Sequence, residues 1–234
     1  MAAQHVVDHE AARATVMAAV RDLDGEAVRE VLAHLLDREG VDSAVTRLAL
    51  PVLKQVGDAW AGGELSVLHE HFVSNTFRGV LGYAGAPAPT ASGRVAVLAC
   101  PPRELHDLPL ELFGAMLRER GWQVVNLGAN TPLAAMEEAA GLLDADACVL
   151  AGVRRSAFQS RMVALTRLRA RVQVPVLLGG EGAVTLPSPP AGTTILPADM
   201  HRAATLVHSL PTRPQREVRR RRPRVPDRPR PHGV

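Results

Sequence analysis

The sequence is poor in cysteine, aromatic residues and lysine, and it has no long apolar run. Its 234 residues include two cysteines, too few for the disulfide framework of a small secreted domain, so we expect Cys100 and Cys148 to be buried, reduced thiols. No window approaches the apolar length of a membrane span, and the first twenty residues are too polar for a secretory signal. We therefore expect a cytoplasmic protein without membrane association.

The sequence also lacks the motifs that bind nucleotide phosphates. No G-x-G-x-x-G follows the first expected strand, and no P-loop lysine exists, because Lys54 is the only lysine of the chain. These absences exclude the usual dinucleotide and ATP sites. No catalytic set of residues stands out, so we expect a binding role rather than an enzyme and assign no catalytic residue.

Apolar periodicity changes once along the chain and divides it into two parts. Residues 8–85 are predicted to form four helices with short connections, which favours an antiparallel bundle cap. A typical apolar stripe at helical spacing is formed by Val28, Val31, Leu32, Leu35 and Leu36. We expect the third helix to be capped by Asp42 or Ser43, and we expect Pro51 to kink it or to cost it one hydrogen bond.

Beyond a Gly-, Ala- and Pro-rich linker at residues 86–93, short apolar runs alternate with helical patterns over residues 94–210. The expected strands are 94–100, 122–127, 146–151, 175–178 and 193–196. The expected helices are 107–120, 132–143, 156–171 and 198–209. This alternation predicts an α/β domain with a doubly wound, five-stranded parallel sheet of the flavodoxin or Rossmann-like kind, in strand order 2-1-3-4-5.

The last segment, residues 211–234, contains nine arginines and almost nothing apolar. It carries the positive excess behind the net charge of +3, so the remainder of the chain is mildly acidic. We expect a disordered tail, because it cannot bury enough apolar surface to fold alone. Two roles remain open for it: a solubilising end, or a basic arm that contacts nucleic acid or an acidic partner.

The loop after the first expected strand carries one histidine, His106, near Glu104 and Asp107. In an open parallel sheet, the loops at the carboxyl ends of the strands form the ligand site. A neutral imidazole backed by a carboxylate is a suitable metal ligand, although a plain salt bridge with either carboxylate is the alternative. Gly179 and Gly180 reach the same edge, where adjacent glycines permit a close approach.

Taken together, these features resemble the cobalamin-binding module of corrinoid methyltransferases and of light-sensing, MerR-type transcription factors. The α/β half of that family carries the motifs D-x-H-x-x-G, S-x-L and G-G. Residues 104–109 match the first motif, with Glu104 in place of Asp and Pro109 in place of Gly. Residues 151–153 stand at the second motif without its serine, and Gly179-Gly180 matches the third.

The resemblance implies a role for each of these residues. His106 would be the lower cobalt ligand, with Glu104 fixing its tautomer and Asp107 beside it. The nucleotide tail of the cofactor would thread between the other two motifs. The residues implied to contact that tail are Ala151, Val153, Gly179 and Gly180.

The bundle carries a second part of the resemblance. Trp60, Glu70 and His71 have the W-x9-E-H spacing of the light-sensing branch, in which these residues cover the upper face of the corrin and accommodate a 5′-deoxyadenosyl group. Without a cofactor, Trp60 would be a core residue, and Glu70 and His71 would belong to a solvated helix face. Ala61 replaces the histidine that ligates cobalt after illumination in such sensors, so we expect a different photoproduct.

The implied function is a cobalamin-binding sensor or regulator that responds to adenosylcobalamin and light. We expect it to act through a protein partner or by self-association, without a DNA-binding domain of its own. One alternative is a corrinoid methyl carrier that uses methylcobalamin. Another is a degenerate scaffold module that has lost cobalamin, for which Pro109 and Ala151 argue.

Overall fold

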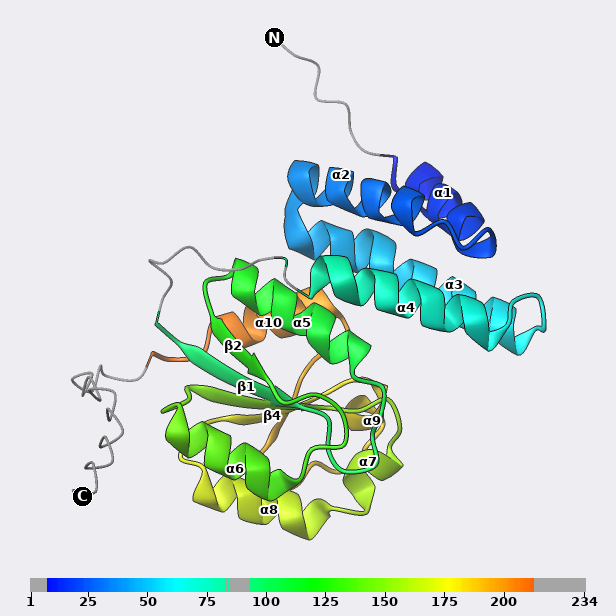
Figure 1. Cartoon of the computed structure of the whole chain (residues 1–234). Coiled ribbons are helices and arrows are strands. Elements are labelled where there is room, and N and C mark those ends of the chain that lie inside the picture. The colour runs from blue at the N-terminus through cyan, green and yellow to red at the C-terminus, as the bar shows by residue number, and fades with distance from the viewer. Residues whose placement is uncertain (1–7, 83, 85–92, 213–234) are drawn as a thin grey trace, which may run out of the picture.

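A computed structural model describes residues 8–82, 84 and 93–212 of the chain as a helical bundle followed by an α/β unit (Figure 1). The bundle contains α1 (His9–Arg21), α2 (Gly25–Ser43), the π-helical segment η1 (Ala44–Ala49), α3 (Leu50–Ala61) and α4 (Val67–Leu81). Asp8 and Asp24 cap α1 and α2, because each carboxylate accepts hydrogen bonds from backbone N–H groups of the first turn. The prediction of a helical N-terminal part is confirmed.

The predicted start of the third helix is wrong. Gly40 has φ +82, and the chain resumes helical geometry immediately, without a new cap from Asp42 or Ser43. The carboxylate of Glu119, from the α/β unit, accepts hydrogen bonds from the backbone N–H groups of Val41 at 2.6 Å and Asp42 at 3.2 Å. A distant carboxylate thus performs the capping that sequence reasoning assigned to a local side chain.

Pro51 lies in the first turn of α3, directly after the π-helical segment. Its ring nitrogen has no hydrogen to donate to the carbonyl of Arg47, which is four residues earlier. The guanidinium of Arg13 donates to that carbonyl at 3.1 Å. The expected loss of one helical hydrogen bond therefore occurs, and α1 supplies the replacement donor.

The α/β unit has the predicted topology. Its strands are β1 (Val95–Ala99), β2 (Gln123–Asn126), β3 (Ala147–Ala151), β4 (Val176–Gly179) and β5 (Thr194–Ile195). They form one parallel sheet in the order β2-β1-β3-β4-β5. Its helices are α5 (Leu108–Glu119), α6 (Leu133–Leu142), α7 (Ser156–Gln159), α8 (Met162–Arg171), α9 (Glu181–Val184) and α10 (Met200–His208).

Two local details differ from the predicted helices. The expected helix 156–171 is broken between α7 and α8, where the chain turns at Arg161. Phe158 in α7 is fully buried, and the guanidinium of Arg161 donates to the carbonyl of Ala157 at 3.1 Å. The short helix α9 was not predicted, because a single turn of four residues that includes a glycine gives no helical apolar pattern.

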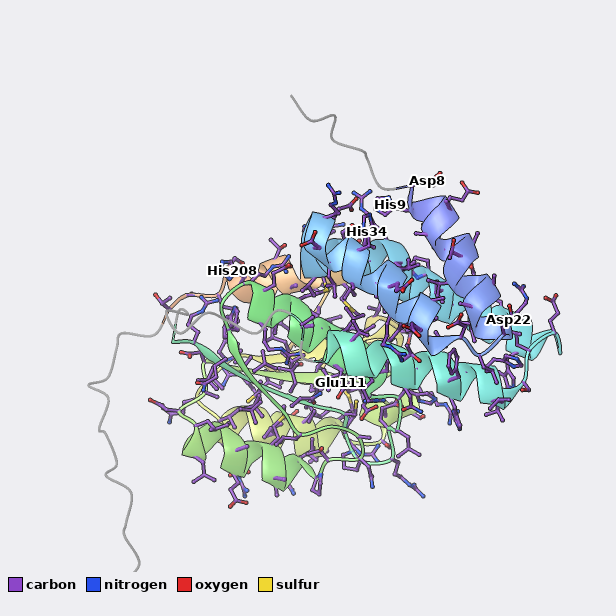
Figure 2. All side chains as sticks on the ribbon, turned by 45° about the horizontal axis from the view of Figure 1, so that its top comes forward. Asp8, His9, Asp22, His34, Glu111 and His208 are labelled. Carbon is purple, nitrogen blue, oxygen red and sulfur yellow. The ribbon has the colours of Figure 1, made fainter. Side chains whose placement is uncertain are left out.

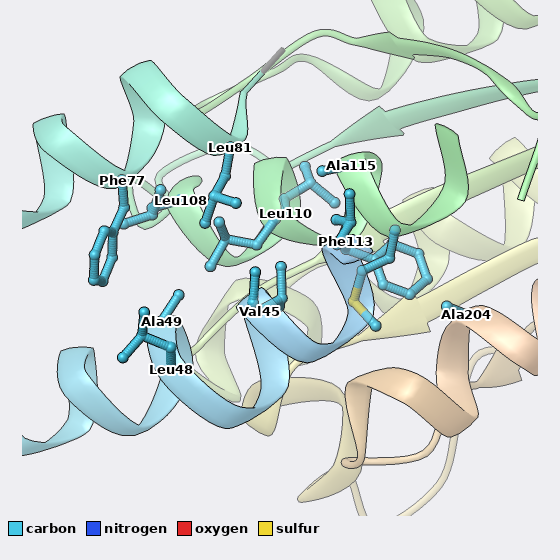
Figure 3. Close-up of a cluster of buried hydrophobic side chains, with 14 of the residues drawn as sticks. Val45, Leu48, Ala49, Phe77, Leu81, Leu108, Leu110, Phe113, Ala115 and Ala204 are labelled. Atoms are coloured by element: carbon cyan, nitrogen blue, oxygen red, sulfur yellow. The ribbon is translucent and has the colours of Figure 1, made fainter. Parts of the chain in front are cut away.

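One core joins the bundle to the α5 and α10 face of the sheet, and a second core lies beneath α6 and α8. Figure 3 shows the junction, where side chains from η1, α4, α5 and α10 meet. Its members include Val45, Leu48, Ala49, Phe77, Leu81, Leu110, Phe113 and Ala204. The continuous apolar contact fixes the bundle against the α/β unit.

Arg94 anchors the end of α10 at the amino edge of the sheet. Its guanidinium lies 3.9 Å from the ring centroid of the fully buried Trp122 and donates to the carbonyls of His208 at 2.7 Å and Leu210 at 2.9 Å. His208 lies on the side of the molecule away from the tip formed by α3 and α4 (Figure 2).

Most of the expected linker and of the Arg-rich tail lie outside the described residues, so the boundaries 8–85, 86–93, 94–210 and 211–234 stay predictions. The two thiols, by contrast, are as expected: Cys100 and Cys148 are both buried and free. Within the described part of the chain, no helix is long and apolar enough to cross a membrane.

Candidate functional site

Three loops meet at the carboxyl ends of β1, β3 and β4. The loops after β3 and β4 are joined by backbone hydrogen bonds from Gly152 to Gly179 at 3.1 Å and from Gly182 to Gly152 at 3.0 Å. Gly180 has φ +82, and a Cβ there would lie 2.5 Å from the carbonyl oxygen of Gly152. The glycine pair thus permits the loop after β4 to approach the backbone of the loop after β3 closely at this edge of the sheet.

Glu104 ties the histidine loop to the loop after β3. Its side chain is only 2% exposed. One oxygen, Oε2, accepts hydrogen bonds from the backbone N–H groups of Val153 at 2.9 Å and Arg154 at 3.4 Å. The other, Oε1, accepts from the backbone N–H of His106 at 3.0 Å and lies 2.6 Å from His106 Nδ1. One carboxylate therefore organises two loops.

These contacts set the charge of Glu104. Burial alone would raise the pKa of its carboxyl group, but the hydrogen bonds from His106, Arg154 and Val153 outweigh burial and hold the pKa below its usual value. Glu104 is therefore an anion at neutral pH. An ionised carboxylate is the acceptor that a histidine N–H needs in order to fix its tautomer.

His106 presents one nitrogen outward. Its Nδ1 faces Glu104, and its side chain is 51% exposed. With Nδ1 donating to the carboxylate, the neutral imidazole keeps its lone pair on Nε2. Within the described residues no complete set of three metal-binding side chains gathers anywhere. His106 therefore offers a single donor nitrogen and not a complete set of metal ligands.

Asp107 was expected beside His106, but its side chain pairs with Arg78 of the bundle. Its carboxylate pairs with the guanidinium of Arg78 at 2.9 Å, and Arg78 also binds Glu111 at 2.7 Å. Both acidic residues lie at the start of α5, where it passes beneath α4, and Glu111 is labelled in Figure 2. Asp107 thus connects the histidine loop to the bundle, whereas Glu104 alone backs the imidazole.

The residues expected around the nucleotide tail lie on the same edge. Ala151 ends β3 opposite Gly179 of β4, and Val153 follows with its side chain 42% exposed. Pro109 is the second residue of α5, a position where a helix does not need the missing N–H. The replacement of Gly by Pro therefore leaves this helix intact.

The bundle residues lie near the tip formed by α3 and α4. Trp60 is 55% exposed, although tryptophan is usually among the more buried residues. On α4, Glu70 Oε2 lies 2.6 Å from Nδ1 of His71, and Ser74 donates to Glu70 Oε1 at 2.8 Å. Trp60 is therefore not a plain core residue, and the acid–imidazole pair is preformed.

Arg78 places this tip relative to His106. It is fixed on Asp107, the residue after His106, and Glu70 and His71 lie about two turns, roughly 10–12 Å, nearer the tip of α4. Figure 1 shows this tip projecting on the same side of the molecule as α7 and α9, which mark the carboxyl edge of the sheet. The structure thus brings the two predicted groups of residues to one side.

Sequence reasoning missed Arg78, Asn130 and Glu119. Arg78 is one arginine among many on a helix, and only the packing of α4 on α5 identifies it. The contacts of Asn130 join loops that are 26 or more residues apart in the chain. No local pattern could have revealed either pairing.

Comparison with known proteins identifies the family. Residues 12–84 and residues 94–189 each match a family model described as a B12 binding domain. Both regions belong to the B12-binding family, and the protein is a cobalamin-binding domain built from a helical part and a Rossmann-like part.

Two relatives are regulators. The chain is 34% identical over 163 residues to the HTH-type transcriptional repressor CarA of Myxococcus xanthus. It is 32% identical over 173 residues to the HTH-type transcriptional repressor CarH of the same organism. The alignments cover 69% and 73% of this chain but 55% and 58% of the relatives, so the chain spans little more than half of their length.

A solved structure shares the fold. The monomethylamine corrinoid protein of Methanosarcina barkeri superposes with a TM-score of 0.65 at 16% sequence identity. The match covers 86% of this chain and 98% of that protein. It confirms the combination of a helical part with a five-stranded parallel sheet.

Proposed function

We propose that this protein is a cobalamin-dependent regulatory module that holds adenosylcobalamin between His106 and a cap formed by Trp60, Glu70 and His71. The observation that carries the proposal is the placement of an outward imidazole, backed by a buried carboxylate, on the same side as an exposed tryptophan and an acid–imidazole pair. The family membership of both parts of the chain supports it.

Each residue has a definite part in the proposed site. His106 would hold the cobalt through Nε2, and Glu104 holds the imidazole ring in place. Trp60 supplies a flat apolar surface for the upper ligand, while Glu70 and His71 supply hydrogen-bonding groups beside it. Ala151, Val153, Gly179 and Gly180 line the path of the nucleotide tail, with Asp107 at its entrance. When bound, cobalamin supplies a cobalt–carbon bond that light can break.

The regulatory step is a shift between two positions of the cap. An upper ligand that touches Trp60, Glu70 and His71 favours the closed position, because it binds that position better than the open one. Without that ligand, the preference would be absent, and the cap surface would be free for a protein partner or a second copy. The names of the two repressors similar to this chain support a role in transcription.

The test is retention of the cofactor. Purified protein is incubated with adenosylcobalamin in the dark, desalted and examined by absorbance before and after illumination. We expect a corrinoid spectrum that changes in light, a shift in elution volume, and loss of affinity in His106→Ala. His34→Ala is the matched control, because this histidine lies on α2, away from the site (Figure 2).

Other results would favour the alternatives. Retention of methylcobalamin with transfer of its methyl group to a thiol, and no response to light, would indicate a methyl carrier. Absence of any corrinoid after desalting would contradict the proposal and favour a scaffold role. A product in which two histidines ligate cobalt would contradict the expectation from Ala61, especially since His69 Nδ1 is engaged with Ser66 at 3.1 Å in the cap of α4.

A further inference from the structure

A single asparagine joins the histidine loop to the loop after β2. The side-chain Oδ1 of Asn130 accepts a hydrogen bond from the backbone N–H of Arg103 at 2.8 Å. The backbone N–H of Asn130 donates to the carbonyl of Glu104, also at 2.8 Å. Asn130 thus holds two consecutive residues of the loop, close before His106.

Both sides of this contact have a left-handed backbone. Arg103 has φ +68 and Asn130 has φ +52. Asparagine tolerates this region better than most residues, but arginine does not, because its Cβ crowds the backbone in this conformation. Arg103 must therefore be held by its surroundings, and the hydrogen bond to Asn130 is a contact that holds it.

The segment that carries Asn130 is itself firmly attached. The backbone of Cys100 donates to Gly128 at 2.9 Å and accepts from Thr131 at 2.9 Å. Thr131 is buried, and its hydroxyl group lies within hydrogen-bonding distance of the carbonyls of Leu127 and Gly128. Asn130 is thus a rigid support rather than a mobile neighbour.

We propose that Asn130 is a positioning residue for the cobalt-binding histidine. It fixes the backbone at Arg103 and Glu104, the fixed backbone directs the Glu104 carboxylate, and that carboxylate orients the ring of His106. The inference rests on the proposed role of His106, but the hold of Asn130 on the loop can be measured without the cofactor.

Three variants separate the parts of this contact. Asn130→Asp keeps an acceptor oxygen, Asn130→Gly keeps the backbone conformation without the acceptor, and Asn130→Ala keeps neither. In the cofactor-free protein, we expect amide hydrogen exchange over residues 103–107 to quicken roughly threefold to tenfold in the Gly and Ala variants, as for the loss of one net hydrogen bond. The Asp variant should exchange like the wild type.

The second measurement uses protein with ¹⁵N-labelled histidine, loaded with cofactor in its cobalt(II) form. A protein histidine on cobalt gives a doublet from ¹⁵N in the electron paramagnetic resonance spectrum, and the cofactor's own base gives a triplet from ¹⁴N. We expect a smaller doublet fraction in Asn130→Gly than in the wild type, and recovery in Asn130→Asp. Thermal unfolding of each variant verifies that it is folded at the assay temperature.

The positioning role would be overturned if Asn130→Gly had the same loop amide exchange rates and the same doublet fraction as the wild type. It would also be overturned if Asn130→Asp restored neither the exchange rates nor the doublet fraction. Failure of the proposed function looks different, because the wild type itself would then show no doublet. Loop exchange in the cofactor-free variants would still decide whether Asn130 holds Arg103 and Glu104.

Discussion

Glu104 Oε1 lies 2.6 Å from Nδ1 of His106, and the second oxygen of the same carboxylate is bound by the backbone of the neighbouring loop. The histidine is therefore oriented by a group that is almost completely buried and fully hydrogen-bonded. This relationship makes the ring direction a property of the fold rather than of a flexible loop, and it leads to the first prediction.

Glu104→Gln should destabilise the protein by about 2–3 kcal/mol, because an amide offers one acceptor oxygen where the carboxylate offers two. At least one of the N–H groups of Val153, Arg154 and His106 then faces an N–H₂ group. Urea unfolding measures the change. Glu111→Gln is the control, since its carboxylate is partly exposed and pairs with Arg78 at the surface, and a change below about 1 kcal/mol is expected. Equal losses for both variants would contradict the account.

Arg78→Ala should loosen the attachment of α4 to the histidine loop. It removes the ion pairs to Asp107 and Glu111, both partly buried, so we expect a loss of about 1–2 kcal/mol and faster amide exchange over α4. Lys54→Ala is the matched control, because its ion pair with Asp58 is well exposed and should contribute less than about 0.5 kcal/mol. Unchanged amide exchange over α4 would show that apolar packing alone holds α4 against the histidine loop.

The junction between bundle and α/β unit should weaken in acid. Burial acts to raise the pKa of Asp42, but Arg120 and His201, each 2.5 Å from its carboxylate, lower it below the usual value. A lowered folded-state pKa gives stability that is present above the ordinary value near 4 and is lost as pH falls through the folded-state pKa.

The measurement is urea unfolding of the wild type and of Asp42→Asn between pH 7 and pH 3. The wild type should be more stable than the variant at pH 7, and the difference should shrink steadily below pH 4. A difference that is independent of pH would mean that the charge of Asp42 does not stabilise the junction.

Neither thiol should react in the folded protein. Burial raises the pKa of Cys100 to about 12, with a contribution from Asp107 and Glu104, and burial raises the pKa of Cys148 to about 12 as well. Both groups are therefore protonated and inaccessible at pH 8. Titration with a disulfide reagent should detect no thiol in native protein and two after denaturation. Rapid reaction of Cys100 before unfolding would indicate that the histidine loop opens.

The architecture could be predicted from the sequence. In the candidate site, the sequence indicated some of the residues but not the distant partners that hold them. Strand order followed from the alternation of short apolar runs with helices, since parallel strands need such crossovers. Trp60, Glu70, His71, Glu104 and His106 were singled out through the resemblance to the family, whose motifs have short, local spacings, and their roles stay predictions.

The missed features all depend on distant partners. Glu119 caps the helix after Gly40, Arg78 takes Asp107 away from the histidine, and Asn130 holds Arg103. Each pairing joins residues at least 27 positions apart, so only the folded chain reveals it. The break between α7 and α8 at Arg161 was also not predicted.

The most direct test of the central claim is the electron paramagnetic resonance spectrum of wild-type protein with ¹⁵N-labelled histidine and bound cobalt(II) cobalamin. The account predicts a nitrogen doublet that disappears in His106→Ala. A triplet in the wild type would show that the cofactor keeps its own base, and a doublet that survives in His106→Ala would place another histidine on cobalt. Either result would contradict His106 as the lower ligand.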